Sequence, residues 1–429
     1  MYIQALLNLL PLAHGIVSPG AAENRDGVLD RLGNLTPYHK APAVEGIKKQ
    51  LPGDCSVDQV MLTHRHGSRG PLQSELSLIQ GLTYTLGNAS QAIEHANLPV
   101  NLQFLKQGYV TKLKPESLSP IGRKQLFDHG VDFLLRYPRL HTDTFVAGNE
   151  ERVIESSHWF GQGYLGGNAS GAHFITIPDD VSKASWIRPW IACPAWGKGW
   201  NVKARATWVK TYLPSITKRL NKLLPGVHLS DDDTHGALFA CAYDLAAYGV
   251  SPWCDVFSPT ELSYFEYELD VMINGGFGYN LIPPEMGPVM GSVYVNTLIE
   301  RFSNATGDAT PLYLEFGHDG TIYTAMTAMG LAKDEPPLCP NGINPFRKWR
   351  TSYQVPFAAN MVWERFTCTD SFRGPQIRLV LNEETFPLSI CAKTKSDKTY
   401  GTCSLVEFIT ANKFSTDIQF GDATWSAAC

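Results

Sequence analysis

The residues best suited to chemistry in this sequence stand together in one short motif, RHGSRGP, at positions 65–71. The guanidiniums of Arg65 and Arg69 can clamp the oxygens of a phosphate group through paired, charge-assisted hydrogen bonds. Gly67 has no side chain, so the backbone can approach a bound group closely. His66 lies between the arginines, where a neutral imidazole can attack phosphorus and form a phosphohistidine that water later hydrolyses. The motif therefore predicts a phosphate site with a covalent nucleophile.

Two short apolar segments are predicted to deliver reactive residues to one edge of a sheet. Residues 57–63 (VDQVMLT) have the composition of a strand and end at the motif, and residues 312–316 (LYLEF) repeat this layout before His318 and Asp319. Helical patterns separate or follow these strands at residues 119–135, 150–160 and 321–331. Strands separated by helices imply an α/β sheet with its functional residues at the carboxyl ends of the strands.

The motif at 65–71 resembles the signature of the histidine acid phosphatases, most closely their secreted fungal phytase-like branch. Further segments match the same family: the His318-Asp319 pair after the second strand, Arg152 in ERVI, LSPIGRKQ at 118–125 and VPFAA at 355–359. These matches, together with the cysteines, run from Cys55 to Cys429, which is nearly the whole chain after its first segment.

The resemblance implies a residue-by-residue mechanism. His66 would attack phosphorus in line, and Asp319 would protonate the leaving oxygen and then accept a proton from the attacking water. Cationic side chains would neutralise the remaining phosphate oxygens, and these are Arg65, Arg69, Arg152 and His318. Because these side chains supply the positive charge, no metal and no cofactor are expected. The acid step needs a protonated carboxyl, so an acidic pH optimum is expected.

The family resemblance and the distribution of predicted strands suggest one division of the chain. The expected fold is a large α/β domain, phosphoglycerate-mutase-like, with a mostly parallel sheet flanked by helices and an inserted, smaller, mainly helical domain. The strand signal fades after about residue 166, which gives the following predicted segments: a signal peptide at 1–22, the α/β domain at 23–165 and 287–429, and the helical insertion at 166–286.

Composition excludes several partners. The chain has 429 residues, 44% of them hydrophobic, and 36 basic against 41 acidic residues give a net charge of −5. There is no basic field of the kind that attracts nucleic acid, and no apolar run after the N-terminus is long enough to span a membrane. The expected partner is a small-molecule phosphate ester, and the sequence gives no indication of the oligomeric state.

Cysteines and glycosylation sequons indicate a secreted protein. The 9 cysteines include no Cys-x-x-Cys pair, so disulfides are favoured over a metal site. Sequons for N-glycosylation begin at Asn34, Asn88, Asn168 and Asn304. The resemblance to fungal phytases implies four disulfides, Cys55 with Cys368, Cys193 with Cys429, Cys241 with Cys254, and Cys391 with Cys403. Cys339 is left as a free thiol.

Two departures from the fungal phytases bear on the substrate. The segment 259–271 (PTELSYFEYELDV) has no basic residue where those enzymes carry lysines. Residues 181–230, in contrast, are rich in basic residues and tryptophan, and they either pack the helical domain or form a basic, aromatic wall for an anionic substrate. In the second case Arg188, Lys198, Lys203 and Arg205 would bind substrate.

The favoured function is therefore a secreted, metal-independent acid phosphomonoesterase of broad specificity, with phytase activity left open. One alternative is a phytase-like scaffold repurposed to bind or transform an unphosphorylated metabolite. Another is a secreted protein that captures phosphate esters without turnover. The combination of a nucleophile with an acid argues against simple capture, because binding alone requires neither.

Overall fold

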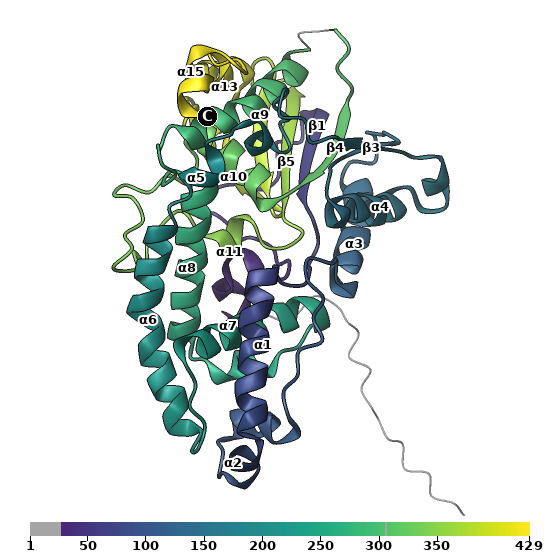
Figure 1. Ribbon diagram of the computed structural model, residues 1–429. Helices are drawn as coiled ribbons and strands as arrows, with labels where there is room; N and C mark the ends of the chain where they lie inside the picture. Colours follow the sequence, from purple (N-terminus) through teal and green to yellow (C-terminus); the bar gives the residue numbers. More distant parts are fainter. Residues whose placement is uncertain (1–26, 305–306) are drawn as a thin grey trace, which may run out of the picture.

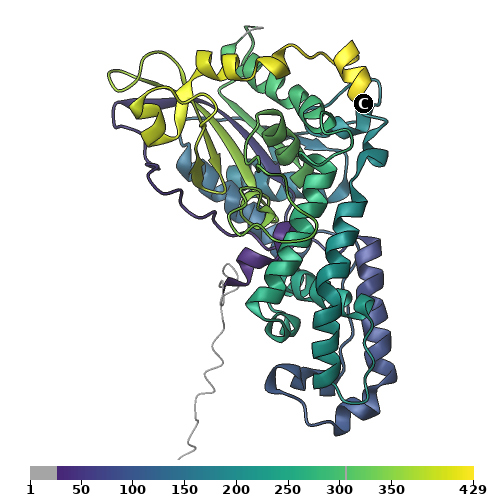
Figure 2. The same ribbon diagram turned by 90° about the vertical axis from the view of Figure 1, so that its left-hand side faces the viewer.

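The computed structural model describes residues 27–304 and 307–429. A central sheet forms one half of the molecule and has helices on both faces, while long helices extend from it to form the other half (Figures 1 and 2). The strands are β1 (Cys55–Arg65), β2 (Thr144–Gly148), β3 (His173–Ile177), β4 (Leu312–Gly317), β5 (Asn360–Cys368), β6 (Gln376–Leu381), β7 (Glu384–Phe386) and β8 (Thr402–Ser404).

The sheet is mixed, which corrects the prediction that it is mostly parallel. Its strand order is β3-β2-β4-β1-β5-β6-β7, and β8 pairs with β6. The β3-β2-β4-β1 half is parallel, whereas β5 runs antiparallel to β1 and the strands beyond β5 also pair antiparallel. The predicted strands 57–63 and 312–316 are confirmed as β1 and β4. Strands β5, β6 and β7 are joined by the short segments 369–375 and 382–383, which contain no helix, and short connections produce antiparallel pairs.

Helices cover both faces of the sheet, as the α/β class requires. On one face α3 (Pro120–Arg136) and α4 (Glu151–Leu165) pack together, and α4 also lies against β2 and β4. On the other face α10 (Asp319–Ala328) lies against β1 and packs on α9 (Met286–Ser303). The Ser119 hydroxyl caps α3 by accepting from the Gly122 N–H, with Pro120 at the first helical position. The predicted α/β fold with a central sheet flanked by helices is confirmed.

The long helices α1 (Gln73–Asn88), α6 (Val202–Leu223), α7 (Asp231–Tyr248) and α8 (Pro259–Phe277) form the other half of the molecule (Figure 1). Helix α7 packs against α1 and α6, and α6 packs against α8. The acidic run at residues 231–233 begins α7, where Ser230 and Asp233 form a capping box. The short helices are α2 (Ser90–His95), α5 (Trp196–Gly199), α11 (Thr351–Gln354), α12 (Lys395–Tyr400), α13 (Leu405–Ala411), α14 (Lys413–Thr416) and α15 (Ala423–Ala428).

The domain boundaries stay a prediction. Strand β3 belongs to the sheet although it lies inside the segment 166–286, and α1 packs on α7 although it precedes that segment. The predicted signal peptide at 1–22 lies outside the described residues. None of the helices within residues 27–304 and 307–429 has the length and apolarity that a membrane crossing demands.

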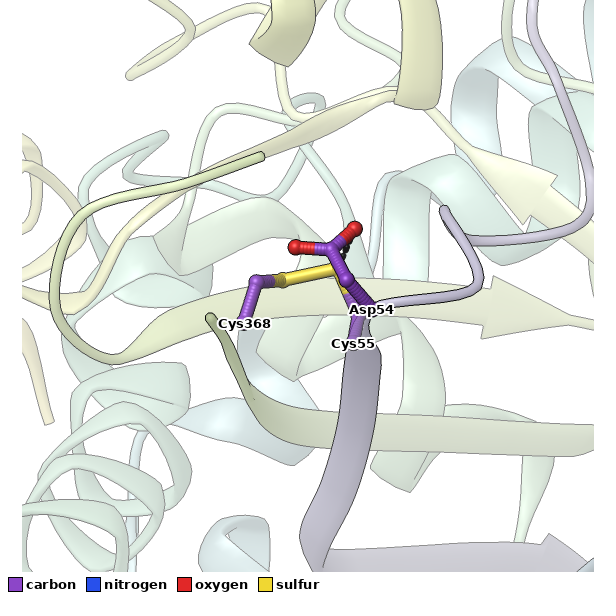
Figure 3. Close-up of side chains that lie close together, drawn as sticks. All are labelled: Asp54, Cys55 and Cys368. Carbon is purple, nitrogen blue, oxygen red and sulfur yellow. Dashed lines mark hydrogen bonds between the residues drawn. A yellow bond between two sulfur atoms is a disulfide. The ribbon is translucent and has the colours of Figure 1, made fainter. Parts of the chain in front are cut away.

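Four disulfides cross-link the chain, and all four predicted pairings are confirmed. Cys55–Cys368 joins the start of β1 to the end of β5 (Figure 3). The other bonds are Cys193–Cys429, Cys241–Cys254 and Cys391–Cys403. Cys339 is a free, exposed thiol, as predicted. Because Cys193 lies 236 positions before Cys429, their bond restricts a long loop of the unfolded chain.

Candidate active site

Three neighbouring parallel strands place the predicted site residues at one edge of the sheet. Strand β1 pairs with β4, and β4 pairs with β2. Arg65 is in register with Gly317, and the His66 N–H donates to the Gly317 carbonyl at 3.0 Å. His66 follows β1, His318 follows β4, and Arg152 lies in the first turn of α4, which follows β2. The carboxyl ends of these strands therefore bring together residues that are far apart in the chain.

His66 is buried with one ring nitrogen engaged. Its Nδ1 lies 2.9 Å from the Gly67 carbonyl, which can only accept, so Nδ1 carries the proton and Nε2 carries the lone pair. Burial, together with the charges of Arg152 and Arg65, holds the pKa of His66 well below its ordinary value. The imidazole is therefore neutral even at mildly acidic pH, which is the form that can act as a nucleophile.

Arg65 is fully buried and bound on several sides. Its Nη1 donates to the backbone carbonyls of Asn34 and Val355, both at 2.5 Å, and its Nη2 lies 3.1 Å from Asp319 Oδ2. The guanidinium also stacks 4.5 Å above the ring of Phe357. Burial lowers the pKa of Arg65 to about 10, so it keeps its charge at acidic and neutral pH.

The surroundings of Asp319 favour its ionised, carboxylate form. It occupies the first position of α10, and its Oδ2 accepts a hydrogen bond of 2.8 Å from Asn34 Nδ2 in addition to the Arg65 contact. Burial raises the pKa of Asp319, but the Arg65 charge, the Asn34 hydrogen bond and His318 outweigh it and bring the pKa below its ordinary value.

Asn34 is a site residue that the sequence did not reveal as one. Its side chain is 3% exposed and donates to Asp319 from 285 positions earlier in the chain. The sequon at Asn34 is therefore not a usable glycosylation site in the folded protein, since the amide is buried against Asp319. Asn88, Asn168 and Asn304 are exposed, and their glycosylation stays a prediction.

Arg69 and Arg152 complete the cluster of cations. Arg69 stacks 5.6 Å from the Phe357 ring, and Arg69 Nη1 lies 3.4 Å from the Tyr243 hydroxyl, which in turn donates to Glu75. Arg152 has a carboxylate on either side: Nη1 lies 3.2 Å from Glu116, and Nη2 lies 2.5 Å from Glu150. The pKa of Arg152 is lowered mainly by burial and next by the charge of Arg69. The two cations therefore belong to one electrostatic cluster.

His318 is buried next to His66, with a ring separation of 5.5 Å. Its Nε2 has no hydrogen-bond partner among the described residues and lies 3.6 Å from Glu150 Oε1. Burial and the Arg152 charge bring the pKa of His318 well below its ordinary value, although Asp319 opposes them. A phosphate oxygen between His318 and Arg152 would provide the missing partner.

The two further family segments hold the 65–71 loop in place. The Ser68 N–H donates to the Gln125 side chain at 2.9 Å, and the Ser119 N–H donates to the Ser68 carbonyl at 2.8 Å. A Cβ on Gly122 would lie 2.2 Å from that carbonyl, so only glycine permits this contact. From the segment 355–359, the Ala358 N–H donates to the His66 carbonyl at 2.9 Å.

Some side chains of the basic segment at 181–230 reach the site, whereas others pair elsewhere in the fold or are exposed. Arg188 reaches the site, because its Nη2 donates to Glu150 Oε1 at 2.8 Å. Arg205 instead pairs with the buried Glu268. Lys198 and Lys203 are exposed. Trp190 lies with its ring 5.9 Å from that of His318, so one tryptophan of the segment borders the site.

His64, next to the motif, has a structural role. Its Nδ1 donates to the Arg65 carbonyl at 2.7 Å, and its Nε2 accepts from His129 Nδ1 at 2.9 Å. Both imidazoles line a cavity of about 1010 Å³ between α3 and strands β1, β5 and β6. None of the predicted site residues lines this cavity.

A potential metal-ligand group occurs away from the site. Asp54, Cys55 and Cys368 lie close together, but the two sulfurs form a disulfide and offer no thiolate (Figure 3).

Comparisons with known proteins agree with this geometry. A family model described as "Histidine phosphatase superfamily (branch 2)" matches residues 56–382. The thiamine-repressible acid phosphatase pho4 of Schizosaccharomyces pombe is 29% identical, covering 99% of this chain and 96% of that protein. Phytase A of Aspergillus terreus is 27% identical, covering 89% of this chain and 88% of that protein. The crystal structure of the D. castellii phytase has a TM-score of 0.81 at 21% identity, over 94% of this chain and 89% of that one, which shows a shared fold.

Gly122→Ala should destabilise the protein and lower its activity, because the new methyl group would press on the Ser68 carbonyl and displace the 65–71 loop. We expect a loss of about 1–3 kcal/mol in the free energy of unfolding, the usual cost of overpacking. Gly81→Ala in α1 is the matched control, since a Cβ there meets nothing within 4 Å. Denaturant unfolding of both variants measures the difference, and equal stability of the two would contradict the close approach of α3.

Proposed function

Because this chain belongs to the histidine phosphatase superfamily, branch 2, we propose that it is a secreted acid phosphatase that hydrolyses small phosphate monoesters through a phosphohistidine. The observation that carries this proposal is His66: its Nδ1 proton is held by the Gly67 carbonyl, and the imidazole stands within a cluster of arginines. Relatives named as acid phosphatases and as phytases support the class of reaction.

In the first step Nε2 of His66 attacks phosphorus and the ester P–O bond breaks. Arg65, Arg69 and Arg152 neutralise the phosphate oxygens, and His318 takes part through its unpartnered Nε2. The low pKa of His66 keeps the nucleophile unprotonated at acidic pH. In the second step water attacks the phosphohistidine and releases phosphate.

Asp319 is proposed as the proton donor to the leaving oxygen and then as the base for water. Its pKa lies below its ordinary value because Arg65 and Asn34 stabilise the carboxylate. A bound phosphate brings negative charge that competes for Arg65 and raises the Asp319 pKa relative to the empty site. Catalysis should therefore decline as pH rises through the pKa of Asp319 in the complex, which gives an acidic optimum.

Secretion is supported by the four disulfides, which persist in oxidising compartments.

His66→Ala should abolish phosphate release, because no other group can form the covalent intermediate. Acid quenching of the wild-type enzyme with a radiolabelled phosphate ester should leave label on His66. His95→Ala, an exposed histidine on α2, is the control and should retain wild-type turnover. Normal turnover by the His66 variant would rule out the mechanism. A wild-type protein that releases phosphate from no ester at any acidic or neutral pH would instead favour the repurposed pocket.

Asp319→Asn should impair alkyl phosphates far more than 4-nitrophenyl phosphate, because nitrophenolate departs without needing a proton. A general acid contributes about 10²–10⁴-fold, so the two losses should differ by about 10²-fold or more. The measurement is kcat/KM for both substrates in the wild type and the variant. Equal losses would remove Asp319 from the acid role.

Asn34→Leu should shift the declining limb of the pH profile to higher pH. The Asn34 amide stabilises the ionised form of Asp319, so its removal raises the Asp319 pKa and keeps the acid protonated to higher pH. A hydrogen bond to a charged group predicts a shift of about one pH unit. The Asn34 backbone carbonyl, which binds Arg65, is retained.

The readout for Asn34→Leu is the pH dependence of kcat for an alkyl phosphate. Asn88→Leu, an exposed position at the end of α1, is the control and should leave the profile in place. A profile that does not move would show that Asn34 does not set the protonation of Asp319.

A further inference from the structure

The arginines at the outer side of the site are surrounded by carboxylates. Arg152 lies between Glu116 and Glu150, at 3.2 and 2.5 Å. Arg188 lies between Glu150 and Asp179, with contacts of 2.8 and 2.7 Å. Glu150 therefore bridges the two guanidiniums. We call the three carboxylates Glu116, Glu150 and Asp179 the acidic rim.

The acidic rim is more exposed than the arginines that it surrounds. The side chains of Arg152 and Arg188 are 14% and 11% exposed, whereas those of Glu116 and Asp179 are 51% and 38% exposed. Glu150 is intermediate at 26% and lies 3.6 Å from His318 Nε2. Cations thus lie inside, next to His318, and the carboxylates lie outside, closer to solvent.

The summed charge of Arg152, Arg188 and the acidic rim does not favour the binding of a polyanion. Two guanidiniums against three carboxylates leave a net charge of −1. Asp180 and Lys183 line the same wall as Asp179 and Arg188, and their opposite charges balance each other. A first phosphate group would meet Arg65 and Arg69 in the interior, but a second phosphate group on the same substrate would meet the rim.

We infer that the acidic rim selects phosphate monoesters whose leaving group carries no second negative charge and disfavours bisphosphates and inositol polyphosphates. This inference rests on the proposed phosphatase function and specifies its substrate class. The absence of basic residues from the segment 259–271 is consistent with it. Like charges at short range repel strongly in a partly buried site, and this repulsion weakens with salt.

A purely structural role for the rim makes a different prediction. If the carboxylates only position Arg152 and Arg188, their neutralisation should harm every phosphate ester alike, because each substrate places its reacting phosphate on the same cations. If the rim repels, the effect should depend on the charge of the leaving group. The ratio of two rates therefore separates the two roles.

The test compares fructose 1,6-bisphosphate with fructose 6-phosphate, which differ by one phosphate group. The measured quantity is the ratio of kcat/KM for the bisphosphate to that for the monophosphate. Glu150→Gln should raise this ratio about tenfold at low ionic strength, and high salt should reduce the difference between variant and wild type. The double variant Glu116→Gln, Asp179→Asn changes the more exposed carboxylates and should also raise the ratio.

Glu151→Gln is the matched control, because Glu151 is the next residue in the chain, is exposed and loses the same charge. Its ratio should stay within about twofold of wild type. A second readout needs no turnover: calorimetric titration with inositol hexakissulfate, a polyanion that the reaction does not consume. Glu150→Gln should bind this ligand about tenfold more tightly than the wild type does.

Two outcomes would overturn the inference. One is an unchanged ratio in both rim variants, and the other is a wild type that hydrolyses the bisphosphate as efficiently as the monophosphate. A wild type that hydrolyses no phosphate ester would overturn the proposed function, and the titration would then still report whether the rim repels polyanions.

Discussion

The site depends on holding several positive charges together in a buried place while no anion is bound. A buried guanidinium is costly unless it is paired and hydrogen-bonded. The protein compensates Arg65 with Asp319 and with the carbonyls of Asn34 and Val355, and it compensates Arg152 with Glu116 and Glu150. These partners stabilise the arginine cluster, and they are also the groups that a bound phosphate must compete with.

The rest of the fold supplies the rigidity that this arrangement needs. The parallel register of β1, β4 and β2 fixes where the three reactive segments end. Helix α3 contacts the 65–71 loop through Gly122 and Gln125. The segment 355–359, which directly precedes β5, also binds the loop through its backbone. Cys55–Cys368 joins β1 to β5 at their far ends. The loop is thus held by backbone contacts on several sides, which keeps the His66 imidazole in one orientation.

The sequence predicted the parts of the site that local patterns encode. Short apolar runs predicted β1 and β4, and the motif at 65–71 predicted the cluster of arginines around His66. Asn34 escaped prediction because its role exists only through a contact with Asp319, 285 positions away, and its sequon indicated a surface residue. The mixed sheet was not predicted because the sequence analysis identified no strand after residue 316, and the antiparallel pairs involve β5 to β8. Glu150 was part of a predicted helix start, and nothing local indicated that it would lie between Arg152 and Arg188.

In the proposed mechanism, the compensation of charge also orders the two steps. Arg65 and Asn34 favour the ionised form of Asp319 when no ester is bound. The first step needs the acid form and the second step needs the base form. In the proposed mechanism, a dianionic phosphate attracts Arg65 and so favours protonation of Asp319 when an ester is bound. After the alcohol has left with that proton, the proposed base is again the Asp319 carboxylate. The Arg65–Asp319 ion pair, which stabilises the protein when no ester is bound, is thus also the contact that controls the protonation of Asp319 in both proposed steps.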